Sequence, residues 1–187
     1  MELRLDLHIH SERSFDGCMS LSEIVALARE RGLNGVAICD HDRVLDEVPE
    51  FDDFLVIPAT EVSTERGHLL GLCVREPIET RKFSESVTAI HAQGGLAVIA
   101  HPFEHSTDAN RLDDVMSRLD GVEIWNSRAD RKNKSANAMA RELAQKLKKP
   151  VTAGSDAHVP EEVGGGVTVL EADELSLSAV KAALLRG

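Results

Sequence analysis

The stretch Asp6-Leu7-His8-Ile9-His10 constrains the fold and function of this chain more than any other. It belongs to an apolar run, residues 3–10, that predicts a β-strand near the N-terminus. Alternate side chains of a strand point to the same side, so we expect Asp6, His8 and His10 to share one face. Two imidazoles at positions i and i+2, emerging at a strand end, provide half of a metal site. The remaining ligands must come from elsewhere in the chain.

Composition and charge limit the classes of protein to which the chain can belong. Its 187 residues are enough for one domain with a sizeable core. The three cysteines are far apart, which is typical of a reduced cytoplasmic protein and not of a disulfide framework. Because we find no apolar run of membrane-span length and no leader, we expect no membrane partner. The formal net charge of −11 disfavours binding to a long nucleic acid, which is also negative.

Strand-like and helix-like segments alternate along the chain. We expect strands at about residues 3–10, 35–40, 55–61, 68–74, 96–100, 121–125 and 151–155, and a peripheral strand at 164–170. We expect helices at about 19–31, 82–93, 109–119, 134–148 and 176–185. This alternation predicts an α/β fold with a largely parallel sheet, and the number of strands suggests a barrel. Since we find no linker and no repeat, we expect residues 1–187 to form a single domain.

The link between two of the predicted strands is too short for a parallel crossover. Only residues 62–67 separate them, whereas a crossover needs roughly a dozen residues. We therefore predict a hairpin. It would place Glu61, at the end of the first strand, close to His68, at the start of the second.

Side chains that can bind a metal recur where the predicted strands end, and this is where an α/β barrel has its active site. They are His8, His10, His41, Glu61, His68, His101, Asp156 and His158. Merely solvated histidines would not be expected to converge in such numbers. By contrast, we interpret His91 as a packing or surface residue within a helix and Cys39 as a small buried thiol. His105 follows His101 on a loop near the expected mouth of the site.

The ordered motifs resemble those of a known family. They are His8-Ile9-His10-Ser11, Asp16-Gly17, Asp40-His41-Asp42, Glu61, His68-Leu69-Leu70-Gly71, His101-Pro102, Glu123 with Asn126, and Gly154-Ser155-Asp156-Ala157-His158. Together they are similar to the motifs of the PHP family, named for polymerase and histidinol phosphatase. The resemblance spans nearly the whole chain and implies a distorted (β/α)7 barrel. Members carry a cluster of usually three metal ions at the C-terminal ends of the strands and are mostly phosphoesterases.

Carried over position by position, the resemblance implies three groups of ligands. One metal would be held by His8, His10, Glu61 and Asp156. A second would share Glu61 and add His68 and His101, and a third would use Asp16, His41 and His158. Every position has a competent side chain, so we expect two or three divalent ions. Mixed nitrogen and oxygen ligands suit Zn, Mn or Fe(II) and do not choose among them.

These residues favour a metal-dependent phosphoesterase, in which a metal-activated hydroxide attacks the phosphorus of a small ester. The substrate would be a nucleotide, histidinol phosphate or a similar compound. We expect Asp156, His158 and His101 to be catalytic. We expect Arg128, Asn126 and Arg13 to bind the substrate, with an arginine clamping the phosphate.

Further acidic residues could orient the ligands, and other functions remain open. Asp6, Asp40 and Asp42 are candidates for orienting the ligand imidazoles from behind. One alternative function is a nuclease or phosphodiesterase acting on short oligonucleotides. Another is a metal-bearing binding domain without turnover. The complete ligand set disfavours the latter, and the acidic charge disfavours a long polynucleotide path.

Overall fold

A computed structural model of the chain describes residues 1–105 and 116–187. Within these ranges eight strands form one sheet in the order β7-β6-β5-β4-β3-β2-β1-β8. The strands are β1 (Glu2–Ile9), β2 (Gly35–Ile38), β3 (Leu55–Thr64), β4 (Gly67–Leu72), β5 (Leu96–Ile99), β6 (Gly121–Asn126), β7 (Val151–Gly154) and β8 (Thr168–Glu171). The helices are α1 (Leu21–Glu30), α2 (Phe83–Ala92), α3 (Ser127–Lys132), α4 (Ala136–Leu147) and α5 (Leu177–Arg186). Short 3-10 turns lie at Met116–Arg118 and Pro160–Glu162.

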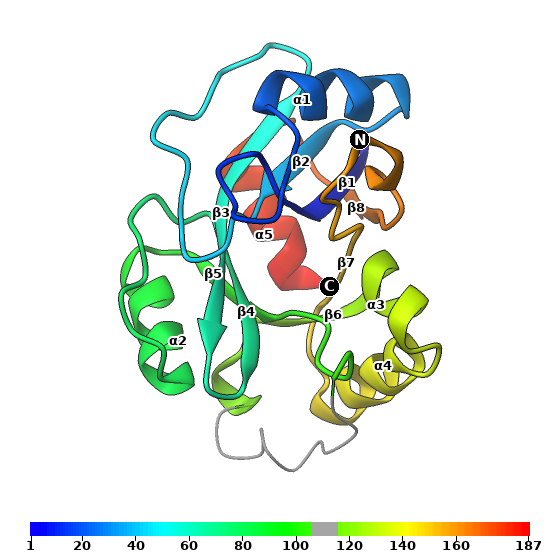
Figure 1. The fold of residues 1–187 in the computed structure, drawn as a ribbon. Coiled ribbons are helices and arrows are strands. Elements are labelled where there is room, and N and C mark those ends of the chain that lie inside the picture. Colours follow the sequence, from blue (N-terminus) through cyan, green and yellow to red (C-terminus); the bar gives the residue numbers. More distant parts are fainter. Residues whose placement is uncertain (106–115) are drawn as a thin grey trace.

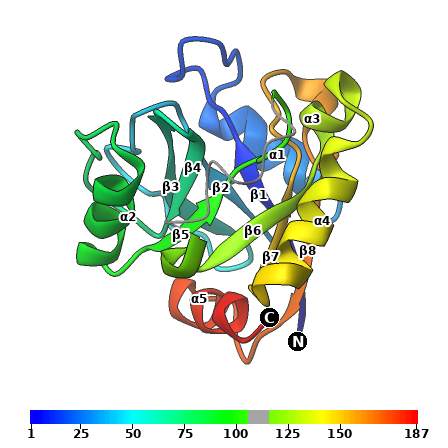
Figure 2. The ribbon, with the colours of Figure 1, turned by 90° about the horizontal axis from the view of Figure 1, so that it is seen from below.

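The sheet curls into a nearly closed barrel with helices around it (Figures 1 and 2). Strands β1, β2 and β3 run parallel, as do β5, β6 and β7. Between these two groups, β3, β4 and β5 pair antiparallel. The peripheral strand β8 pairs antiparallel with β1. This arrangement confirms the predicted α/β barrel, with β8 as its eighth strand.

The predicted hairpin is present, but it is longer than the sequence indicated. Strand β3 continues to Thr64, and the turn lies at residues 65–66. Glu61 is therefore inside the strand, opposite Leu70, and Ser63 lies opposite His68. Helix α1 begins as its residues predict, because Ser20 and Glu23 form a capping box. The predicted helix at 109–119 falls mostly outside the described residues, and residues 43–54 contain no helix.

Three apolar clusters hold the fold together. One fills the barrel interior with alternate side chains of β1 to β5, and α5 packs against it. The second lies between α2, α4 and the outer face of β4 to β6, and the third between α1 and the outer face of β1 to β3. No described helix is long and apolar enough to cross a membrane.

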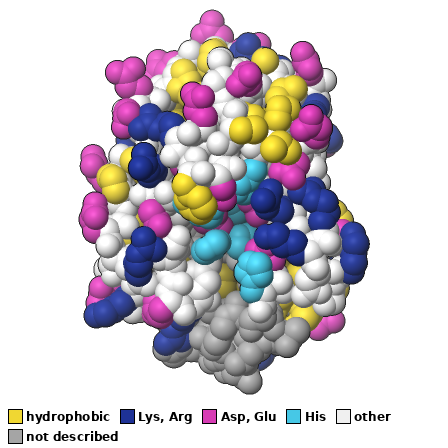
Figure 3. Space-filling model, viewed as in Figure 1, with side chains coloured by type: hydrophobic (Ala, Val, Ile, Leu, Met, Phe, Trp, Pro, Cys, Tyr) yellow, Lys and Arg dark blue, Asp and Glu magenta, His cyan; other side chains and the backbone are white. Residues whose placement is uncertain are grey.

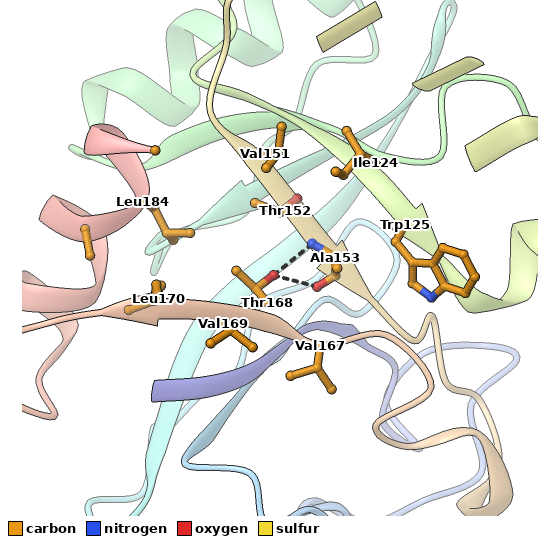
Figure 4. A pocket seen from close by; sticks show the side chains of 12 residues that line it. Ile124, Trp125, Val151, Thr152, Ala153, Val167, Thr168, Val169, Leu170 and Leu184 are labelled. Atoms are coloured by element: carbon orange, nitrogen blue, oxygen red, sulfur yellow. Dashed lines mark hydrogen bonds between the residues drawn. The ribbon is translucent and has the colours of Figure 1, made fainter. Parts of the chain in front are cut away.

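The barrel is joined less tightly between β7 and β8 than elsewhere. There the hydroxyl of Thr168 donates to the carbonyl of Ala153 at 2.9 Å and accepts from its amide at 2.8 Å (Figure 4). Beside this link is a cavity of about 330 Å³, which we call the seam cavity. Its lining is mostly apolar and comes from β6, β7, β8, the residue before β8 and the end of α5: Ile124, Trp125, Val151, Thr152, Ala153, Val167, Thr168, Val169, Leu170, Ala183, Leu184 and Gly187.

Candidate metal centre

The two-residue period of the strands places most of the expected ligands. Ile57 and Ala59 belong to the interior cluster, so Glu61, two residues further along β3, also faces inward. Cys39 also belongs to the interior cluster, and His41, two residues further along, faces inward in the same way. In β4, the interior residue Leu70 lies two positions after His68. The site therefore continues the inward-facing rows of the barrel.

Strand β1 does not follow this simple alternation. Leu5 and Leu7 belong to the interior cluster, whereas Ile9 packs in the outer cluster beside α1. The pairing register of β1 with β2 shifts between Asp6 and Ile9, and this irregularity turns His8 and His10 into the barrel. Gly154 provides the room, since a Cβ added there would lie 2.3 Å from the Cβ of His8.

Glu61 is the centre of the site. Its side chain is 1 % exposed, and both carboxylate oxygens face imidazole nitrogens. Oε1 lies 2.8 Å from His68 Nδ1 and 2.9 Å from His101 Nε2. Oε2 lies 3.1 Å from His41 Nδ1 and 3.3 Å from His10 Nε2. One buried carboxylate therefore reaches imidazoles from four different segments of the chain.

Two further carboxylates complete the polar cluster. Asp156 Oδ1 lies 3.3 Å from His10 Nε2 and 3.6 Å from His8 Nε2. Asp16 Oδ2 lies 3.0 Å from His158 Nε2 and 3.4 Å from His41 Nε2. Asp156 has a φ of 56°, in the left-handed region that costs free energy for a residue with a side chain. The fold therefore maintains a costly backbone conformation at the residue whose carboxylate faces His8 and His10.

In residues 1–105 and 116–187, three groups of donor atoms are close enough together to hold a metal. They are His8 with His10 and Asp156; His8 with Glu61 and His101; and His10 with Asp16, His41 and His158. Atoms within a group lie within 4.8 Å of one another. The groups overlap with the three sets implied by the resemblance but differ from them in four places. His10 also joins the group of Asp16, and His8 joins that of His101. Glu61 is absent from the group of His8, His10 and Asp156, and His68 contacts Glu61 without belonging to a group.

The orientation of two imidazoles fits a metal centre. Among the residues that the structure describes, the buried Nδ1 atoms of His41 and His68 have no hydrogen-bond partner, although each lies close to Glu61. A buried polar atom without a partner is costly, so such atoms are expected where a ligand completes them. Imidazole nitrogen with carboxylate oxygen is also a donor set that Zn, Mn and Fe(II) accept. The side chains present therefore fit divalent ions.

Electrostatics ties protonation to metal binding. Burial alone would raise the pKa of Glu61, but His8 and the other imidazoles outweigh it and hold that pKa well below its usual value. Burial would lower the pKa of His10, yet hydrogen bonds to Asp156 and Glu61 raise it to about 9. The pKa of His101 is raised to about 9 against burial, chiefly by Glu61. Ions entering the cluster must displace these protons, so their affinity should fall at low pH.

The residues that orient the imidazoles differ from those expected. Asp6, Asp40 and Asp42 do not contact a ligand ring; they accept hydrogen bonds from backbone amides, including those of Ser155, Ser11 and Ser63 respectively. This prediction was wrong because each aspartate bonds to an amide that is distant in the sequence and that only the folded barrel brings beside it. Burial raises the pKa of Asp6 to about 6 despite these bonds.

Other side chains take the orienting role. Glu123 is 1 % exposed and lies 2.9 Å from His8 Nδ1, and it also accepts from the backbone amide of His101 at 2.8 Å. Glu104 Oε2 lies 3.1 Å from His101 Nδ1. Ser14 Oγ lies 3.3 Å from His10 Nδ1. The sequence motifs already included Glu123, the one acidic residue in the apolar β6, but did not predict this role.

A pocket of about 240 Å³, which we call the metal pocket, opens from the cluster to solvent. Its lining consists of Phe15, Asp16, His41, Glu61, Ser63, His68, His101, Glu104, His105, Arg128, Lys132, Asp156 and His158. Figure 3 shows histidine side chains in this hollow, with hydrophobic atoms on one flank and Lys and Arg side chains on the other. Arg128 and Lys132 belong to α3, a helix that the sequence analysis missed.

The three predicted substrate-binding residues have different positions. Arg128 lines the metal pocket, and its guanidinium lies 3.4 Å from Glu162. Arg13 does not line it and instead pairs with Asp46 at 2.6 Å. Asn126 is fully buried, caps α3 and donates to Glu123 and Asp156. The structure thus brings one of the three to the pocket, together with Lys132 and His105.

The other interpretations of single residues agree with the structure. His91 lies on α2, 2.7 Å from Asp120 and away from the cluster. Cys39 is a buried free thiol whose pKa is raised by burial, and the other two cysteines are also free.

The sequence matches two known family models. Residues 6–99 match the PHP domain, and residues 134–187 match the family described as PHP-associated. The chain belongs to the PHP domain family. The two matched segments share one sheet, since β7 and β8 of the second segment belong to the same sheet as the strands of the first.

Relatives of this PHP domain have varied names. An uncharacterized protein, MJ1587, from Methanocaldococcus jannaschii is 33 % identical over 67 % of this chain and 82 % of its own. A probable phosphatase from Shewanella amazonensis is 24 % identical over 88 % of this chain and 80 % of its own. A 5'-3' exoribonuclease from Haemophilus influenzae is 38 % identical, but only over 38 % of this chain and 29 % of its own.

Solved structures share the fold of this PHP domain. A two-domain Bacteroides vulgatus protein, described as containing a predicted PHP-like metal-dependent phosphoesterase, aligns with a TM-score of 0.74 at 19 % identity. The alignment covers 98 % of this chain and 62 % of the other. Endonuclease Q, in complex with a 27-mer duplex substrate, aligns with a TM-score of 0.70 at 18 % identity, over 98 % of this chain and 56 % of its own.

Proposed function

We propose that this PHP domain is a metal-dependent hydrolase of small phosphate esters. One observation carries the proposal: a buried carboxylate, Glu61, is surrounded by imidazoles at the floor of a solvent-open pocket. Two of these imidazoles have Nδ1 atoms for which the described part of the chain offers no hydrogen-bond partner. Such a floor is suited to holding ions against a phosphate, and the membership of the family agrees with it.

The residues of the chain would divide the work between ion binding and substrate binding. His8, His10, Asp16, His41, Glu61, His68, His101, Asp156 and His158 would hold two or three divalent ions. Such ions lower the pKa of water and stabilise charge on phosphoryl oxygens during displacement. Glu123 and Glu104 would keep His8 and His101 in the required orientation. We assign the catalytic roles to Asp156, His158 and His101, which face the pocket from the ends of two strands.

The rim supplies positive charge for the substrate. Arg128 and Lys132 line the same pocket on α3, although each has an acidic partner, Glu162 and Glu104. A phosphate entering the pocket would compete for these cations, and arginine suits it through paired hydrogen bonds. We infer that Arg128 binds the phosphate and that Lys132 is the residue the sequence analysis overlooked.

We favour a small substrate because of the charge of the chain. A net charge of −11 should repel a long polyanion beyond the pocket, and salt should weaken this repulsion. The exoribonuclease and Endonuclease Q among the similar proteins act on nucleic acids by name, so a nuclease acting on short oligonucleotides is our second candidate.

A panel of phosphate esters tests the proposal. The purified protein is loaded with Mn(II), Zn(II) or Fe(II) and assayed on mononucleotides, sugar phosphates, histidinol phosphate and a phosphodiester. We expect hydrolysis with at least one metal, its loss in His101→Gln, and no loss in His91→Gln. The second variant is a matched control, because His91 is also paired with a carboxylate but lies outside the pocket. Equal activity of both variants and the parent protein would contradict the assignment.

A length series separates the two candidate functions. Hydrolysis per mole of enzyme is compared for a mononucleotide, a trinucleotide and a single-stranded thirty-mer, at low and moderate ionic strength. We expect the mononucleotide to be hydrolysed fastest and the thirty-mer to gain from salt. If the thirty-mer is degraded fastest at low salt, the nuclease candidate replaces the small-ester candidate.

A further inference from the structure

Phe15 occupies an unusual position for an aromatic side chain. It is 85 % exposed, more than any other large hydrophobic residue in the described ranges. Single exposed apolar residues are common on protein surfaces, so exposure alone assigns no role. What distinguishes Phe15 is its place, because it lines the metal pocket and directly precedes Asp16.

The ring of Phe15 is held in a defined orientation. It stacks on the imidazole of His41 with 5.0 Å between the ring centroids and 23° between the planes. His41 in turn is fixed by Glu61 and Asp16, at 3.1 and 3.4 Å. The exposed phenyl ring therefore has a set position relative to the floor of the metal pocket.

The other phenylalanines do not share this arrangement. Phe54, Phe83 and Phe103 are buried, and Phe51 packs beside Phe54 and Arg29. The chain has no tyrosine, and its one tryptophan, Trp125, lines the seam cavity. Within the described residues, Phe15 is thus the aromatic side chain, other than histidine, that lines the metal pocket.

The metal pocket has an aromatic side chain and basic side chains around its floor. Phe15, Asp16 and His41 line it together with the cations Arg128 and Lys132 from α3. In Figure 3 hydrophobic atoms lie on one flank of the histidines and basic side chains on the other. A ligand that suits this layout combines a phosphate, for the floor and the cations, with a flat apolar group for the exposed ring.

We propose that Phe15 is a stacking platform, and that the substrate is a phosphate ester carrying a planar aromatic ring, a nucleotide in particular. The proposal rests on the phosphoesterase function proposed above and narrows its substrate class. Stacking of a base on an aromatic side chain strengthens binding about 5- to 150-fold, because both faces are apolar and flat. Sugar and alcohol phosphates lack such a face and gain nothing from Phe15.

The test compares one substrate that has a base with one that lacks it. KM and kcat are measured for a nucleoside 5'-monophosphate and for ribose 5-phosphate in the parent protein, Phe15→Ala and Phe15→Trp. We expect Phe15→Ala to raise KM for the nucleotide about tenfold or more while KM for ribose 5-phosphate changes less than about twofold. Phe15→Trp should retain nucleotide binding. Phe51→Ala is the matched control, since it removes a partly exposed phenyl ring outside the pocket.

An equal change of KM for the two substrates in Phe15→Ala, or no change for either, would overturn the stacking role. A second measurement covers the case in which no ester is hydrolysed, which would refute the proposed function itself. In a Phe15→Trp, Trp125→Phe protein the introduced indole is the sole tryptophan, so its fluorescence reports on the platform. We expect quenching by the nucleotide and none by ribose 5-phosphate. Equal quenching by both, or by neither, would contradict the stacking role independently of turnover.

Discussion

The metal pocket and the seam cavity are both hollows of the same barrel, but their walls have opposite chemistry. The seam cavity is the larger, about 330 Å³ against about 240 Å³. Its walls are mostly aliphatic, whereas the metal pocket is lined almost entirely by ionisable side chains. Volume therefore does not locate the functional site. The difference arises from topology, since the metal pocket gathers strand ends and the seam cavity lies where β7 and β8 are joined by side-chain bonds.

The largest expected effect comes from removing the central carboxylate. Glu61→Gln should lower kcat/KM by about a thousandfold or more. A neutral amide would bind divalent ions near its two terminal atoms much more weakly than the two oxygens of a carboxylate would. The substitution should also cost at least one bound metal per chain. Asp16→Asn, at the more exposed end of the cluster, should cost less activity and less metal. Steady-state kinetics and elemental analysis of both variants give the order, and the reverse order would mean that the site is assigned wrongly.

A smaller effect should follow from loosening the ligands without removing one. Glu123→Gln keeps the size of the side chain but weakens its bonds to His8 and to the amide of His101. We expect metal affinity to fall about 10- to 100-fold, with the cluster otherwise intact. Competition with a metal-binding dye measures this affinity. Unchanged affinity would show that the barrel backbone alone orients His8.

The smallest expected effect concerns the link between β7 and β8, beside the seam cavity. Thr168→Val removes both hydrogen bonds to Ala153 and leaves two partly buried backbone groups without this partner. The free energy of unfolding should fall by about 1–3 kcal/mol, measured by denaturant titration. Activity at moderate temperature should be unchanged, because the seam cavity shares no lining residue with the metal pocket. A selective loss of activity in a stable variant would break the distinction between the two regions.

The sequence predicted those parts of the site that follow from strand periodicity and local motifs. Glu61 faces inward because β3 alternates regularly, and His41 continues the inward-facing row of Ala37 and Cys39 beyond the end of β2. The inward turn of His8 and His10 has another origin, since it depends on a register shift that arises only when β1 pairs with β2. Asp6 therefore does not share a face with His8 and His10, although the sequence had predicted that it would. It bonds instead to the amides of Ser155, after β7, and Gly164, before β8.

The remaining errors concern long-range contacts of polar side chains. Nothing local distinguishes Arg13, which pairs with Asp46, from Arg128, which lines the metal pocket. Helix α3 is only six residues long, too short for a clear periodic pattern, although Asn126 is a typical capping residue for its start. Lys132 was missed together with this helix.

The central claim is that the imidazoles and carboxylates around Glu61 hold metal ions. It is tested most directly by elemental analysis of the protein, purified from metal-supplemented medium and again after chelation and reconstitution. We predict two or three divalent ions per chain, a lower number in Glu61→Gln, and an unchanged number in Thr168→Val. Fewer than one ion per chain, with no gain on reconstitution, would contradict the account.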